Sequence, residues 1–120
     1  MNIEILREYC LAKQAVSEHL PFDNDTLVYK VAGKMFCLIS IKEPDSCNLK
    51  CDPEKSIELR LDYQGIKPGY HMDKKHWNTV SFTQDVPEPL IIDLIDQSYQ
   101  LVCQKLSKKA KIEAGLLDIL

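Results

Sequence analysis

The side chains that could do chemistry in this chain are concentrated in residues 67–80. This segment combines amines, which neutralise phosphates, with imidazole, amide and hydroxyl groups, which donate hydrogen bonds, and with aromatic rings, on which bases stack. In chain order these residues are Lys67, Tyr70, His71, Lys74, Lys75, His76, Trp77, Asn78 and Thr79. The combination is typical of a surface that binds nucleic acid.

Two other interpretations of the same segment remain open. In the first, Tyr70 and Trp77 flank the core of a sheet and the lysines only keep the tip of a turn solvated. In the second, Tyr70, His71, His76 and Trp77 line a pocket for a small ligand or a docking site for a protein. The salt dependence of binding distinguishes a nucleic-acid surface from a pocket. Affinity for phosphates falls steeply with ionic strength, whereas affinity for a ligand in a pocket need not.

Motifs of common enzymes are absent from the sequence. It contains no glycine-rich nucleotide loop, no GxSxG elbow and no HExxH zinc motif. Cys47 and Cys51 are spaced CxxxC with no second pair of cysteines or histidines behind them, which does not match the usual zinc sites. We therefore expect a non-enzymatic protein with no metal and no cofactor.

The composition is that of one globular domain covering residues 1–120. Apolar residues make up 45% of the chain, enough for a core without disulfides or metal, and no apolar run approaches the ~20 residues of a membrane span. The N-terminal residues are acidic where a signal peptide would be basic. Five cysteines, an odd number scattered among apolar neighbours, indicate buried free thiols in a reducing cytoplasm. They are Cys10, Cys37, Cys47, Cys51 and Cys103.

The charges are unevenly distributed along the chain. The net charge is −3, which argues against nonspecific coating of nucleic acid. Acids dominate residues 1–25 and 85–96, whereas residues 103–112 contain four lysines and no acid. A last helix with acidic residues near its start and basic residues near its end matches the helix dipole, so this charge pattern is explained without a bound ligand. We expect any DNA binding to be confined to one face and to be readily weakened by salt.

The N-terminal half predicts a helix, a hairpin and a third strand. The helix runs from a cap at Asn2 to about Lys13, and residues 17–25 have the composition of a loop. Two apolar, β-prone runs, 26–31 and 35–41, surround a glycine and predict the hairpin. Residues 46–51 alternate apolar and polar side chains and predict the third strand.

The C-terminal half predicts two helices separated by two strands. Asp52 and Pro53 begin a helix that continues through Leu61, with Ile57 and Leu61 four residues apart. Residues 66–82 then contain two strands, the second at 77–82, around a turn region with a polar tip at 73–76. A long amphipathic helix spans Leu90 to about Leu106. This order predicts an α+β fold in which an antiparallel sheet has its helices on one face.

The sequence resembles the MmcQ/YjbR family of small bacterial proteins. The resemblance lies in residues 21–36, in residues 48–53 and above all in the GYHMDKKHWNTV block at 69–80, with further similarity at 94–102. Membership implies a frataxin-like (CyaY-like) fold with two β-wings, likened to the double-wing DNA-binding domain of a phage transcription factor. The acidic ridge with which frataxins bind iron is not expected, since Glu4, Glu8 and Glu18 are too few acids for it.

The resemblance further implies contact with double-stranded DNA through the wings, and we expect a monomer. Lys30 and Lys34 lie near the first hairpin and join the residues of the 67–80 segment as candidate contacts. The predicted DNA-binding set is Lys30, Lys34, Lys67, Tyr70, His71, Lys74, Lys75, His76, Trp77, Asn78 and Thr79.

Overall fold

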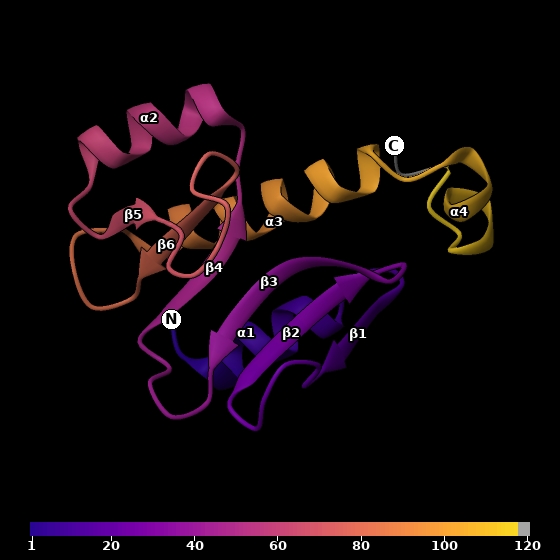
Figure 1. The fold of residues 1–120 in the computed structure, drawn as a ribbon, viewed down its shortest axis with the longest axis horizontal. Coiled ribbons are helices and arrows are strands. Elements are labelled where there is room, and N and C mark those ends of the chain that lie inside the picture. Colours follow the sequence, from indigo (N-terminus) through magenta and orange to yellow (C-terminus); the bar gives the residue numbers. More distant parts are fainter. Residues whose placement is uncertain (118–120) are drawn as a thin grey trace.

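The protein is described by a computed structural model that covers residues 1–117. One helix precedes four consecutive strands, and a second helix, two more strands and two final helices follow (Figure 1). In chain order they are α1 (Ile3–Leu11), β1 (Val16–His19), β2 (Thr26–Val31), β3 (Lys34–Ser40), β4 (Ser46–Lys50), α2 (Pro53–Asp62), β5 (Ile66–Pro68), β6 (Trp77–Ser81), α3 (Glu88–Gln104) and α4 (Lys108–Glu113). No helix within this range is both long and apolar enough to cross a membrane.

The strands form a single antiparallel sheet in the order β1-β2-β3-β4-β6-β5. A tight turn at Ala32 and Gly33 joins β2 to β3, and both residues have positive φ, 47° and 83°. Positive φ at two consecutive turn residues matches the right-handed twist of a hairpin. The predicted α+β fold with an antiparallel sheet is confirmed.

One face of the sheet packs against α1, α2 and α3 and forms the main core. Alternate strand residues such as Tyr29, Cys37 and Leu49 point into it and meet Leu6 of α1 and Ile95 of α3. The opposite face, called here the open face, has a smaller apolar cluster. Val28, Leu38 and Trp77 form this cluster, and Met35 and Met72 pack against it.

Helices α1 and α2 begin at the capping residues that the sequence predicted. The side-chain oxygen of Asn2 accepts a hydrogen bond from the backbone N–H of Ile5 at 2.9 Å. Asp52 does the same for Glu54 at 2.9 Å, with Pro53 at the first helical position. Both caps satisfy backbone donors that a helix start otherwise leaves without a partner.

Strand β1 lies within a stretch for which the sequence predicted a loop from residue 17 onward. It is a short edge strand held by long-range contacts centred on Glu18. That carboxylate accepts hydrogen bonds from Arg7 of α1 and from the Tyr29 hydroxyl, each at 2.8 Å. Such contacts are invisible in the local sequence Val-Ser-Glu-His.

Helix α2 does not bury the apolar pair Ile57 and Leu61 against the sheet. Ile57 and Leu61 are 59% and 82% exposed, and the buried residues are Ser56 and Leu59. The helix is oriented by polar contacts, because Asn78 bonds both to Ser56 and to Arg60, which lies one turn further along α2.

The long helix predicted from Leu90 to about Leu106 is α3, and a separate short helix, α4, follows it. Helix α3 ends at Gln104, and the Ser107 hydroxyl caps α4 by accepting a hydrogen bond from Ala110 N at 3.1 Å. We predicted a last helix that begins with acidic residues and ends with basic ones, as the helix dipole favours. This prediction is wrong, because the last turn of α3 contains no basic residue. Lys108 and Lys109 instead begin α4.

All five cysteines are buried and free, as predicted. The Cys37 thiol lies among those of Cys10 and Cys47, and hydrogen bonding to them together with burial raises its pKa well above the ordinary value. A thiol in that state is a poor nucleophile. The cysteines are therefore core residues.

Candidate nucleic-acid interface

The antiparallel topology sorts the connections of the sheet onto two ends. The β2–β3 turn, the end of β4 and loop 69–76 between β5 and β6 share one end. We call this the basic end, because Lys34, Lys50, Lys74 and Lys75 lie there. The β2–β3 turn with Lys34 is called the first wing, and loop 69–76 is called the second wing.

The opposite end of the sheet is acidic. It contains the β1–β2, β3–β4 and β6–α3 connections, which carry five carboxylates and one lysine, Lys42. The carboxylates are Asp23, Asp25, Glu43, Asp45 and Asp85. The net charge is therefore only −3, although the two ends of the sheet carry charges of opposite sign.

The second wing has a compact backbone that depends on Gly69. A Cβ at this position would lie 2.9 Å from Trp77 Cβ and 3.1 Å from its carbonyl oxygen, closer than side chains allow. His71 adopts a φ of 57°, and its ring lies 4.0 Å from that of Tyr70. The Tyr70 backbone N–H donates to the Thr79 hydroxyl at 3.0 Å, which holds the start of the loop over the sheet.

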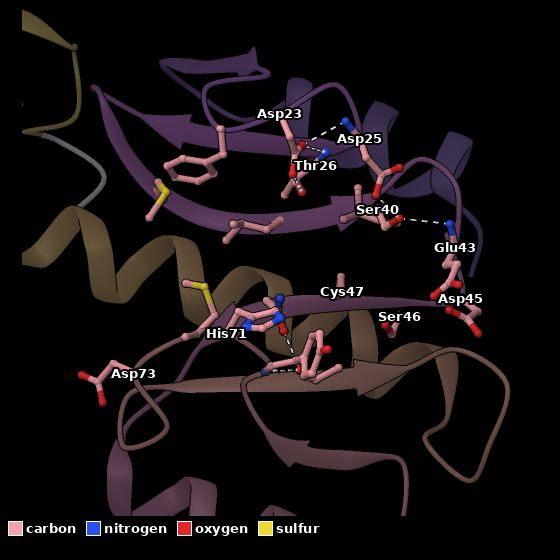
Figure 2. A pocket seen from close by; sticks show the side chains of 18 residues that line it. Asp23, Asp25, Thr26, Ser40, Glu43, Asp45, Ser46, Cys47, His71 and Asp73 are labelled. Carbon is pink, nitrogen blue, oxygen red and sulfur yellow. Dashed lines mark hydrogen bonds between the residues drawn. The ribbon is translucent and has the colours of Figure 1, made fainter.

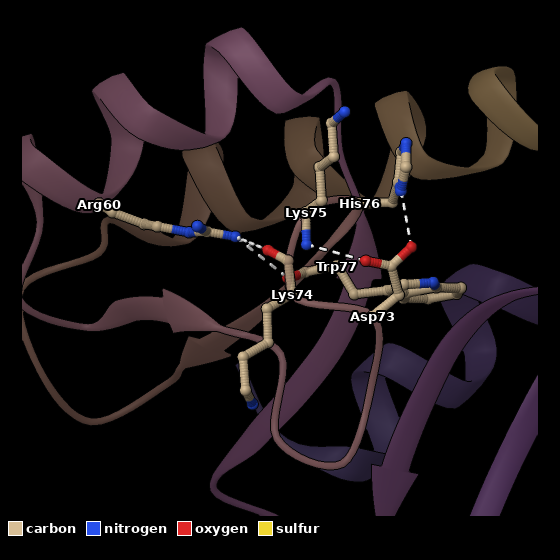
Figure 3. Close-up of polar contacts among 6 residues, drawn as sticks. All are labelled: Arg60, Asp73, Lys74, Lys75, His76 and Trp77. Atoms are coloured by element: carbon tan, nitrogen blue, oxygen red, sulfur yellow. Dashed lines mark hydrogen bonds and ion pairs between the residues drawn. The ribbon is translucent and has the colours of Figure 1, made fainter.

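Arg60 of α2 supports the second wing from the helix-packed side (Figure 3). Its Nε donates to Asn78 Oδ1 at 2.8 Å, and its Nη2 donates to the carbonyl oxygens of Lys74 at 2.5 Å and of Trp77 at 3.3 Å. Asn78 is only 2% exposed and also donates to Ser56. The prediction that Asn78 belongs to the binding surface is therefore wrong, because its amide is buried and forms its hydrogen bonds with Arg60 and Ser56.

Asp73 organises the tip of the second wing. One carboxylate oxygen pairs with His76 Nδ1 at 2.7 Å, and the other accepts the Lys75 backbone N–H at 3.0 Å. The hydrogen bond with His76, followed by that from Lys75, lowers the pKa of Asp73 below its ordinary value. Asp73 therefore stays negative and offsets part of the positive charge of the wing.

The two wing lysines have different surroundings. Lys74 Nζ donates to the Gly69 carbonyl oxygen at 3.2 Å and so closes the loop on itself. The Lys75 side chain extends from the opposite side of the loop in Figure 3. Lys75 is exposed and forms no ion pair with residues 1–117.

Two further residues of the predicted set have structural partners. Trp77 is 8% exposed and packs in the open-face cluster, so no ring face is free for a base. The Thr79 hydroxyl donates to Asn48 Oδ1 at 2.6 Å and accepts from the Tyr70 backbone. Tyr70, in contrast, is 70% exposed, and His71 is also exposed.

Lys30 and Lys67 do not come together. Lys30 is half-buried on β2, and Lys67 is exposed on the edge strand β5, with β3, β4 and β6 between them. Four strand spacings separate these positions, or about 19 Å. Of the two, only Lys30 lies near the basic end, because it pairs with Met35 beside the β2–β3 turn, whereas Lys67 pairs with Thr79 in the middle of β6.

Sequence reasoning missed Lys50 and Lys105. Lys50 is the last residue of β4, and Lys105 follows α3, yet both line one cleft next to Lys34 at the basic end. The sequence separates them by more than fifty residues, and only the topology brings them together. The lysine run after α3 was a signal, but the helix dipole explained it without a site.

A second, larger pocket of about 770 Å³ lies on the open face (Figure 2). Tyr70 and His71 line it, together with carboxylates of the acidic end, but His76 and Trp77 do not. The four residues of the predicted Tyr/His/Trp pocket therefore do not share one cavity.

Known proteins are similar to this chain over most of its length. A family model described as YjbR matches residues 11–101. The chain belongs to the YjbR family. It is 31% identical over 101 residues to the uncharacterised protein YjbR of Escherichia coli K12, covering 83% of this chain and 86% of that protein. It is 43% identical over 90 residues to the uncharacterised YbdF of Escherichia coli O157:H7, 74% of each chain.

Solved structures of similar proteins share the fold. The Deinococcus radiodurans protein DR2400, with domain DUF419, aligns at a TM-score of 0.90 and 41% identity, over 97% of this chain and 89% of that one. A Pseudomonas syringae protein aligns at a TM-score of 0.72 and 28% identity, over 84% of this chain and 98% of that one. The YjbR relatives named above are uncharacterised, so membership of the family establishes the fold and not the activity. The function has to be inferred from the geometry of the candidate site.

Proposed function

We propose that this YjbR-family protein binds duplex DNA, without catalysis, through the two wings at the basic end of its sheet. One observation carries the proposal: both wings and the end of β4 lie at the same end, while the acidic connections lie at the other. A polyanion is attracted to one end and repelled by the other, so the charge pattern sets an orientation as well as a site.

The dimensions of the basic end suit a short stretch of duplex. The strand pairs β2–β3 and β5–β6, which carry the wings, have their centres three strand spacings apart, or about 14 Å. Phosphates advance about 3.4 Å per base pair along one strand of DNA. The two wings therefore span roughly four base pairs, enough for contacts to three or four phosphates.

The contacting residues differ from those that the sequence suggested. Lys34 of the first wing and Lys75 of the second are the exposed amines best placed for phosphates, and Lys105 adds a third. Tyr70 and His71 are the exposed groups that supply more directional contacts. Trp77, Asn78 and Thr79 act indirectly by holding the second wing in place.

The test compares two double variants with the same change of net charge. Lys34→Ala with Lys75→Ala removes one amine from each wing, and Lys42→Ala with Lys67→Ala removes two amines outside the wings. Fluorescence anisotropy of a labelled duplex at low salt measures the affinity. We expect the wing variant to bind more weakly and its salt slope to flatten by about 2, with little change for the control. Equal losses for both variants would refute the assignment to the wings.

A further inference from the structure

The basic end contains a cleft of about 570 Å³ that the wings border but do not fill. It lies between the β2–β3 turn, the end of β4, the first residue of β6 and the junction of α3 with α4. Figure 1 shows α4 near the tip of the β2–β3 hairpin, and residues of both elements line the cleft. The volume is within the range of about 300–1,000 Å³ that is usual for small-molecule sites.

Three lysine side chains line the cleft: Lys34, Lys50 and Lys105. No carboxylate of residues 1–117 forms an ion pair with any of them. Burial and the charge of Lys105 lower the pKa of Lys50, and the charge of Asp73 opposes this to a smaller extent. The cleft therefore brings like charges together, at a cost that a bound anion would reduce.

The remaining walls of the cleft are mostly apolar. Met35 and Trp77 contribute from the sheet, and Val102 and Leu106 contribute from the end of α3. A bare inorganic anion would leave these walls uncovered. A ligand that carries both a multiple negative charge and a flat or apolar group would use the lysines and the walls together.

We propose that this cleft binds a small phosphate monoester with an apolar or aromatic organic part, such as a nucleoside monophosphate. A monoester carries close to two negative charges at neutral pH, whereas each phosphodiester of duplex DNA carries one, so a cleft lined by three lysines fits the monoester better. The inference goes beyond the DNA-binding proposal, because it depends on Lys50 and Lys105 inside the cleft and needs no contact from the second wing.

The experiment titrates the intact protein with AMP, adenosine and inorganic phosphate. Trp77 is the only tryptophan and lines the cleft, so its fluorescence reports occupancy, and calorimetry gives the affinity. We expect AMP to bind more tightly than adenosine or phosphate alone, because only AMP uses the lysines and the walls at once. Equal affinities for AMP and adenosine, or no AMP binding at millimolar concentration, would overturn the proposal.

Variants assign the binding to the lysines. Lys50→Met and Lys105→Met keep apolar side chains of similar length, and each should weaken AMP binding by about tenfold or more. Lys42→Met at the acidic end is the matched control and should bind AMP like the wild type. The Lys50→Met protein without ligand should also melt at a higher temperature, because it no longer carries the repelled charge. AMP affinity that is equal in Lys50→Met, Lys105→Met and the wild type would contradict the proposal.

The two proposals fail separately. Lys75→Ala lies outside the cleft and should weaken DNA binding while it leaves AMP affinity unchanged. DNA binding without AMP binding refutes the cleft proposal alone, and AMP binding without DNA binding refutes the wing proposal alone.

Discussion

The contact between Arg60 and Asn78 should be the main polar support of the second wing. Arg60 reaches from α2 and bonds to Asn78 and to two backbone carbonyls at the end of the loop. The change Asn78→Ala removes a charge-assisted hydrogen bond, worth about 1.5–3 kcal/mol, and deprives Ser56 of its donor. We therefore expect a loss of about 3 kcal/mol in the free energy of unfolding.

This loss converts into a melting shift through the length of the chain. Globular proteins gain about 2.1 cal/mol/K of entropy per residue on unfolding, or about 0.25 kcal/mol/K for 120 residues. A loss of about 3 kcal/mol then lowers Tm by about 12 °C. Calorimetry or circular dichroism measures the shift, and Asn24→Ala in the exposed β1–β2 loop is the matched control, expected to change stability by less than about 0.5 kcal/mol.

A double-mutant cycle with Arg60→Met then isolates the pair. If Arg60 and Asn78 act as one unit, the stability lost in the double variant differs from the sum of the two single losses by about 1.5 kcal/mol or more. Amide hydrogen exchange of His76 and Trp77, which bond to the Asp73 carbonyl oxygen, should accelerate in either single variant. A Tm within about 2 °C of the wild type for Asn78→Ala, with unchanged exchange in the wing, would refute this reasoning.

Three further predictions concern stability. Trp77→Ala should cost about 3–5 kcal/mol in urea unfolding followed by circular dichroism, because it empties the open-face cluster; a loss below about 1 kcal/mol would contradict its burial. Gly33→Ala should cost about 1–2 kcal/mol, since Gly33 has a φ of 83° and the added Cβ meets no clash; an unchanged midpoint would count against backbone strain. The backbone N–H groups of Gln64 and Gly65 lower the pKa of Asp85, so its stabilisation is present above pH 4 and is lost as the pH falls through that lowered pKa. Asp85→Ala should therefore be less stable than the wild type at neutral pH, with the gap closing in acid; a gap independent of pH would contradict this.

Elements with strong local signals were predictable from the sequence. The caps at Asn2 and Asp52, the alternation in β4 and the two apolar runs around Gly33 depend on neighbouring residues, and the structure has them where predicted. The sequence did not predict β1, whose partners Arg7 and Tyr29 lie outside the strand.

The orientation of α2 could not be read from apolar spacing. Ile57 and Leu61 lie four residues apart and are both exposed, whereas Ser56 and Leu59 are buried and the Asn78 amide bonds to Ser56 and Arg60. A buried polar group without its partner costs about 1–3 kcal/mol, so this network favours the side of α2 that satisfies Asn78.

The candidate site was predictable in part. The block at 69–80 correctly marked the second wing, but its residue types did not separate exposed groups from supporting ones: Tyr70 is exposed, whereas Asn78 is buried. Lys50 gave no local signal and Lys105 only that of the lysine run after α3, because the strand order and the end of α3 create their proximity. Charge counted along the chain thus missed a cluster that exists only in three dimensions.

The dependence of DNA affinity on salt tests the central claim most directly. The measurement is the association constant of the wild-type protein for a labelled duplex over a series of sodium chloride concentrations. Contacts to three or four phosphates predict a straight line of log K against log salt with a slope of about −3. A slope shallower than about −1, or no binding at low salt, would contradict DNA binding through the basic end.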